Sequence, residues 1–232
     1  MAPEPTLEAP PGGQPPAYEL YAFWRSAASY RVRVALAMKG LTAHEHVIDL
    51  EMGAQHSAAY RAVNALGGLP TLVEPGHAPI TQSLAILEFL EDVQPTPALL
   101  PADPRGRARV RSLSGMIASD THPLVTPRIR KYLAATSGID DTGWRTWQTH
   151  WFETGLHAVE QRLSTEAGTG LFCHGDSPTM ADICLASVVA VMRVLKIHVD
   201  HTPTIDRIIG QCDGVEAFAK AHPGRQLGAP VG

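Results

Sequence analysis

The run Ser26-Ala27-Ala28-Ser29 stands where a segment typical of a strand gives way to one typical of a helix. The first turn of a helix leaves backbone N–H groups unpaired, and together with the helix dipole they stabilise an anion. A thiolate placed there would be stabilised in the same way as a cysteine thiolate at a helix start, with the Ser26 hydroxyl donating to the sulfur. The alternative is that Ser26 only caps the helix, and spacing alone favours this capping role.

Other segments carry groups that can bind carboxylates. Gln82-Ser83 opens a predicted helix, where amide N–H groups, a hydroxyl and a side-chain amide can hold a carboxylate or simply cap the helix. His122 lies in the segment Asp120-Thr121-His122-Pro123-Leu124, although a lone histidine is more often structural. Three arginines are candidates for bidentate binding of substrate carboxylates, although most arginines are solvated surface residues: Arg25, Arg128 and Arg193.

The 11 histidines raise the question of a metal site. His44, Glu45 and His46 open the second strand, which is predicted at His44 to Leu50, but neither an HExxH motif nor a third ligand is apparent in the sequence. We therefore expect no metal site.

Two helical patterns predict structural roles. Thr179 and Asp182 have the spacing of a capping box, with Thr179 at the N-cap. A stripe of tryptophans at helical spacing predicts core packing: Trp144, Trp147 and Trp151.

The elements that must position these residues fall into two halves. Residues 18–93 read as strand, helix, strand, helix, two strands around a Pro-Gly turn, and helix, with the first two strands parallel because a helix connects them. A proline-rich stretch follows, and beyond it the patterns predict helices at 107–119, 125–135, 142–163, 180–195 and 204–221. We therefore expect a disordered Pro-rich tail at 1–17, an α/β domain at 18–94, a linker at 95–105 and an all-helical domain at 106–232.

Composition excludes several classes of protein. The 232 residues are 44% hydrophobic and 18% charged, as in a globular protein, and the net charge of -4 argues against nucleic acid as a partner. The longest strongly apolar run, Ile183 to Met192, is too short to span a membrane. Three cysteines without CxxC spacing favour a reducing, cytoplasmic location, and the first residues have no apolar core of a secretory signal.

The chain resembles the glutathione transferase superfamily in this order of elements and in four segments. These are RSAASYRVRVAL after the first strand, Leu69-Pro70 before the third strand, Gln82-Ser83 at the start of the third helix and SPTMAD in the helical half. Within this superfamily the chain is similar to the zeta class, the maleylacetoacetate and maleylpyruvate isomerases, over about Tyr18 to Pro230. The resemblance implies a thioredoxin-like βαβαββα domain followed by a helical bundle domain.

The resemblance also implies roles for individual residues. Ser26 would stabilise the thiolate of bound glutathione, and Arg25, Arg128 or Arg193 would orient the substrate. Leu69-Pro70 would be a cis-proline turn whose main chain meets the cysteinyl part of glutathione. The residues that would hold the tripeptide are Gln55, Leu69, Pro70, Gln82, Ser83 and His122. The sequence departs from the class pattern Ser-Ser-Cys-Ser, because Ala27 and Ala28 replace the second serine and the cysteine.

The activity that this resemblance implies is glutathione-dependent cis–trans isomerisation of a maleyl-type keto or dicarboxylic acid by reversible thiolate addition. Ala27 and Ala28 leave two alternatives open: a transferase that conjugates glutathione to small electrophiles, and a glutathione-binding protein without turnover. A homodimer is also expected from the resemblance.

Overall fold

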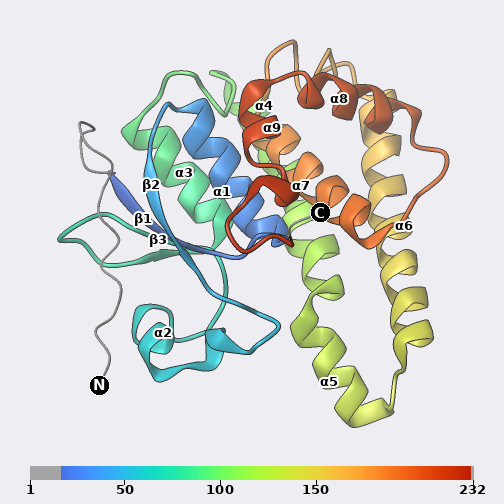
Figure 1. Cartoon of the computed structure of the whole chain (residues 1–232). Helices are drawn as coiled ribbons and strands as arrows, with labels where there is room; N and C mark the ends of the chain where they lie inside the picture. The colour runs from blue at the N-terminus through green and yellow to red at the C-terminus, as the bar shows by residue number, and fades with distance from the viewer. Residues whose placement is uncertain (1–16, 231–232) are drawn as a thin grey trace.

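The computed structural model describes residues 17–230, so the predicted disordered tail lies outside the described residues except for Ala17. Figure 1 shows a sheet with its helices in the N-terminal part and a helical C-terminal part beside it. The sheet has the strand order β2-β1-β3-β4, with β1 parallel to β2 and antiparallel to β3. The predicted fold class, a thioredoxin-like domain followed by helices, is confirmed.

The N-terminal part buries one face of the sheet. Tyr18, Leu20 and Ala22 of β1 are buried, and Tyr18 packs edge-on against Phe89 of α3. Helix α1 is almost wholly buried because it contacts both α3 and the C-terminal helix α7. The elements are β1 (Tyr18–Ala22), α1 (Ala27–Met38), β2 (Ala43–Val47), the 3-10 helix η1 (Ala54–His56), α2 (Ala58–Val63), β3 (Thr71–Val73), β4 (Ile80–Thr81) and α3 (Ser83–Val93).

The described residues of the C-terminal part form helices joined by loops, with a single isolated bridge between Thr169 and Gly175. Helix α7 is its buried centre, in contact with α1, α4 and α8. None of the helices within residues 17–230 has the length and apolar character required to cross a membrane. The elements are α4 (Pro104–Gly115), the π-helix η2 (Met116–Thr121), the 3-10 helix η3 (His122–Val125), α5 (Pro127–Ser137), α6 (Asp141–Thr165), α7 (Met180–Leu195), α8 (Pro203–Asp213), α9 (Glu216–Lys220) and the 3-10 helix η4 (Pro223–Arg225).

Several element boundaries differ from the expectation. The second strand ends at Val47 and not at Leu50, because the Asp49 side chain accepts the N–H groups of Glu51 and Met52 at 2.8 and 3.2 Å and closes a turn there. The helix expected at 204–221 is two helices, because Val215 is extended, with φ -95 and ψ 125, at the start of α9.

The capping box at the start of α7 is confirmed. The carboxylate of Asp182 accepts the Thr179 N–H and hydroxyl, both at 2.8 Å, and also the Cys173 N–H at 2.7 Å. This side chain therefore ties the preceding loop to the buried helix. The tryptophan stripe is only partly core: Trp144 is buried, whereas Trp147 is half-buried and its indole N–H donates to the Leu124 carbonyl at 2.8 Å.

Candidate active site

The start of α1 is the first part of the site. Ser26 is extended at the N-cap, and its Oγ accepts the Ser29 N–H at 3.2 Å, which confirms the capping role. Because the oxygen accepts this bond, the hydroxyl proton remains available to donate to a ligand. Ala27 and Ala28 are buried at 1% and 7% exposure, and as alanines they supply no polar side chain to the site.

The second part is the loop that precedes β3. The Leu69-Pro70 bond is cis, as the family resemblance predicts. Gly67 has φ +64, and a Cβ on it would lie 2.7 Å from the Gln55 carbonyl oxygen, so this loop runs directly against Gln55. The Gln55 Nε2 donates to the Leu50 carbonyl at 3.5 Å, but its Oε1 is buried and has no partner within the described residues. An unpaired buried acceptor costs about 1–3 kcal/mol, so this oxygen has the character of a ligand-binding group.

The third part is the start of α3. Gln82 has φ 70 and ψ 116, a region that few residues other than glycine occupy, and its exposed side chain makes no capping hydrogen bond. It is therefore not an ordinary N-cap, and strained backbone of this kind is concentrated at binding sites. Ser83 is buried, and its Oγ accepts a hydrogen bond from the Arg31 Nε at 2.9 Å.

Sequence reasoning missed Arg31, which is only 2% exposed and lies in α1. Its second hydrogen bond runs from Nη1 to the Ser187 Oγ at 3.1 Å, and no carboxylate pairs with it in the part of the chain that the structure describes. Burial lowers the pKa of the Arg31 guanidinium. The signal in the sequence was an arginine four residues from both Ala27 and Ala35, which places it on the same helix face as these two apolar residues.

His122 follows the π-helical turn, a type of irregularity that often occurs at functional sites. Burial, together with the positive charges of Arg31 and Arg128, lowers the pKa of His122 to about 3. The imidazole is therefore neutral near pH 7 and can donate from one nitrogen while it accepts at the other. Helix α6 fixes this turn through Gly155, because a Cβ there would lie 2.1 Å from the Thr121 hydroxyl.

The three predicted substrate arginines do not share one cavity. Arg25 lines a cavity of about 410 Å³ that lies between the N-terminal part of the chain and α5. Arg130 of α5 lines the same cavity. Arg25 pairs with Glu51, and its guanidinium lies 5.7 Å from the centre of the Trp24 ring.

The other two arginines lie elsewhere. Arg128 is exposed at the start of α5, close enough to His122 to affect its pKa. Arg193 lines a different cavity of about 390 Å³ beside Tyr30, and it pairs with Asp213 through two bonds of 2.9 and 3.1 Å. The structure thus brings Arg128 to His122 and separates Arg25 from Arg193.

Comparison of the sequence and the fold with known proteins identifies relatives of this chain. The sequence model of the protein family described as glutathione S-transferase, N-terminal domain, matches residues 25–93. The chain is 40% identical over 206 residues to the maleylacetoacetate isomerase of Rhizobium meliloti, covering 89% of this chain and 96% of that protein.

Two solved structures are similar over nearly the whole chain. The maleylacetoacetate isomerase of Methylobacterium extorquens AM1, crystallised with malonate and glutathione, matches with a TM-score of 0.90 and 44% identity, covering 92% of this chain and 100% of that one. The holo structure of a maleylpyruvate isomerase, described as a bacterial glutathione S-transferase of the zeta class, matches with a TM-score of 0.88 and 35% identity over 91% of this chain and 100% of that one.

Proposed function

Since the chain belongs to the zeta class of the glutathione transferase superfamily, we propose that it catalyses glutathione-dependent cis–trans isomerisation of a maleyl-type keto or dicarboxylic acid. The observation that carries the proposal is that the relatives with this activity in their names match it over about nine-tenths of its length. One relative was crystallised with glutathione together with malonate, a small dicarboxylate.

The residues of this chain fit glutathione. The buried Oε1 of Gln55 has no donor among residues 17–230, and an amide N–H at the glycyl end of the tripeptide would supply one. The main chain of Leu69, beside Pro70, would meet the cysteinyl part. Gln82 and Ser83, at the N-terminus of α3, would hold the γ-glutamyl carboxylate, with the charge of Arg31 behind the Ser83 hydroxyl.

When bound, glutathione supplies the thiolate whose reversible addition turns the cis double bond into a single bond that can rotate. The Ser26 hydroxyl would donate a hydrogen bond to the sulfur, and the first turn of α1 would add its N–H groups and dipole, so that the anion would be favoured over the thiol. His122 remains neutral near pH 7 and reaches the tripeptide from the helical part as a hydrogen-bonding group.

The basic groups around the cleft orient the substrate carboxylates. Arg25 lines the cavity between the two parts of the chain, where Arg130 adds a second positive charge. Arg128 lies at the start of α5 beside His122. Arg193 lines the other cavity, and it takes part only if a substrate carboxylate reaches that cavity and replaces Asp213 as its partner.

The proposal extends to a homodimer in the cytoplasm. The dimer is supported by the membership of a superfamily whose members are usually dimeric. The location is supported by the cysteines, since Cys173, Cys184 and Cys212 are all buried and free.

The test is to incubate the full chain with maleylpyruvate, and separately with maleylacetoacetate, with and without glutathione, while following the trans product and total free thiol. Trans product only with glutathione, at constant free thiol, is the expected result. Loss of thiol into a stable conjugate would instead identify a conjugating transferase. If neither product nor thiol changes with either substrate, the isomerase proposal is wrong.

The role of Ser26 is tested with a matched pair of variants. Ser57 caps α2 by accepting the Tyr60 N–H at 3.2 Å, the same bond that Ser26 makes to Ser29 at 3.2 Å. Ser26→Ala and Ser57→Ala each lose about 1 kcal/mol of capping. Only Ser26→Ala should lower kcat, by roughly a hundredfold, and reduce the thiolate absorbance of bound glutathione at neutral pH. Equal effects of the two variants would limit Ser26 to capping.

A further inference from the structure

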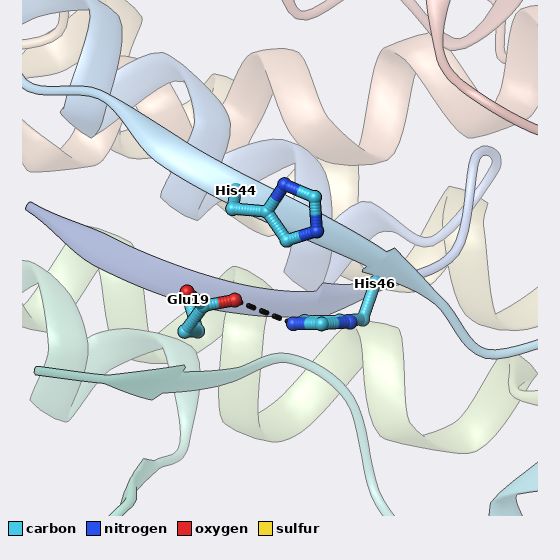
Figure 2. Close-up of side chains that lie close together, drawn as sticks. All are labelled: Glu19, His44 and His46. Carbon is cyan, nitrogen blue, oxygen red and sulfur yellow. Dashed lines mark hydrogen bonds and ion pairs between the residues drawn. The ribbon is translucent and has the colours of Figure 1, made fainter. Parts of the chain in front are cut away.

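Figure 2 shows three side chains gathered on one face of the sheet: Glu19 of β1, with His44 and His46 of β2. Glu19 pairs in register with His44, and Tyr21 with His46, so all four side chains point to the same side. Tyr60 of α2 lies on this side too, with its ring 5.6 Å from that of Tyr21. The sequence showed the two histidines but no third ligand, and the fold supplies Glu19 from the neighbouring strand.

We propose that Glu19, His44 and His46 bind one divalent transition-metal ion of the Zn²⁺ type. Each residue offers one ligand atom, and these atoms all lie within 4.8 Å of one another. The His46 Nε2 is 2.5 Å from the Glu19 Oε2, and the two imidazole rings are 4.8 Å apart at 82°. Ligands around a tetrahedral zinc ion lie about 3.4 Å apart, given Zn–N bonds of roughly 2.1 Å. Binding of the ion would require the side chains to rotate from their present separations to this spacing.

The donor set selects the class of ion. Two imidazoles and one carboxylate suit Zn²⁺, Ni²⁺ and Cu²⁺, whereas Ca²⁺ and Mg²⁺ require mainly oxygen ligands. The Glu19 carboxylate neutralises part of the charge of the ion and already accepts a hydrogen bond from His46 when that nitrogen is protonated. Metal binding therefore replaces an existing contact between two ligands.

One ligand is already held in place. The His46 ring stacks on Tyr21 with centroids 4.6 Å apart and an interplanar angle of 18°, which restrains its orientation. His44 is exposed on the edge strand β2, so the ion can enter from solvent and His44 can turn toward it. Three protein ligands leave at least one position of the ion for water or an external ligand.

The cluster is independent of the proposed isomerase site. None of its residues belongs to the set that would hold glutathione. The ion would rest on β1 and β2, whereas that set lies in η1, the loop before β3, the start of α3 and η3. Variants of the cluster therefore should leave the basal isomerase activity unchanged.

The test is calorimetric titration of the full chain with Zn²⁺, followed by the electronic spectrum of the Co²⁺-loaded protein. We expect one ion per chain and at least about a tenfold rise in Kd for Glu19→Gln, His44→Gln and His46→Gln. His198→Gln is the control, because His198 is also exposed and also lies beside a carboxylate, Asp200 at 3.1 Å. It should leave the Kd unchanged.

Two results would overturn the metal site. One is that the wild-type protein binds Zn²⁺ only at millimolar concentrations. The other is binding that the three cluster variants leave intact, which would place the ion at another histidine. Circular dichroism spectra of the three cluster variants that match the wild-type spectrum would show that the variants are folded, so that a loss of binding is a loss of the site alone. Either result is separate from the isomerase assay, which is run without added metal.

Discussion

Replacement of Arg31 by methionine should weaken glutathione binding strongly. It should change the stability of the protein only a little. Arg31 is buried at 2% exposure, and its Nε donates to the Ser83 Oγ at 2.9 Å. If Ser83 donates its hydroxyl proton to the γ-glutamyl carboxylate, the guanidinium lies one hydroxyl away from that anion. Arg31 then acts as a positioning residue, which orients the Ser83 hydroxyl and supplies positive potential behind it.

The magnitude follows from this geometry. The observed 2.9 Å and an ordinary O–H···O bond of about 2.8 Å place the two charges at most about 6 Å apart. At an effective dielectric constant of about 20, the attraction is about 3 kcal/mol, or roughly a hundredfold in affinity. Stability should change little, because an apolar side chain of similar length often replaces a buried charge without loss. The Ser187 hydroxyl keeps its own bond to the Cys184 carbonyl at 2.6 Å.

The assay is calorimetric titration with glutathione at pH 7.5, with thermal unfolding of the same samples. Ser187→Ala is the matched control, because it removes the other hydrogen bond of Arg31, 3.1 Å long, and leaves the one to Ser83. Arg31→Met should raise the Kd of glutathione about a hundredfold, and Ser187→Ala less than about threefold. A folded Arg31→Met protein whose Kd stays within threefold of wild type would refute the reasoning.

Two further predictions concern pH and stability. The pKa of His122 is lowered to about 3 in the native chain. Below pH 6.5 this histidine is therefore protonated in the unfolded chain but not in the native one, and the free energy of unfolding decreases as the pH is lowered. The stability lost between pH 6.5 and 5 should therefore be about 2 kcal/mol smaller in His122→Gln, measured by urea unfolding, and an equal loss would contradict the lowered pKa. Asp182→Ala should cost about 3–5 kcal/mol of unfolding free energy, because three buried donors lose their acceptor. The exposed Asp200→Ala is its control, and denaturant midpoints within error of each other would count against the capping argument.

The order of elements was predictable because it depends on local patterns. Strand and helix periodicity in the first half, and the capping box at Thr179, are set by residues a few positions apart. Boundaries were less predictable wherever a side chain competes with the main chain for hydrogen bonds. Asp49 ends β2 in this way, and the π-helical turn before His122 depends on packing against Gly155, which is distant in sequence.

The chemistry of the site was only partly predictable from the sequence. Ser26, Gln55 and Gln82 were singled out, but the unpaired Oε1 of Gln55 and the left-handed backbone of Gln82 are properties of the folded chain alone. The third ligand of the proposed metal site was invisible for a related reason. Glu19 is 25 positions from His44 in the numbering, and only the parallel register of β1 and β2 makes them neighbours.

Helix α1 and its C-cap residue Lys39 carry three buried basic side chains, and they are neutralised differently. Arg33 binds Glu45 through two bonds, and the Lys39 Nζ lies 2.6 Å from Glu91. Arg31, the more buried of the two arginines, has only the hydroxyls of serine residues as partners within the described residues. Because a buried charge without a counter-ion is costly, the missing anion has to come from outside the protein for the charge to be balanced. The position of Arg31 beneath the start of α3 is where a bound carboxylate would supply that balance, which is why its loss should be felt in glutathione binding and not in folding.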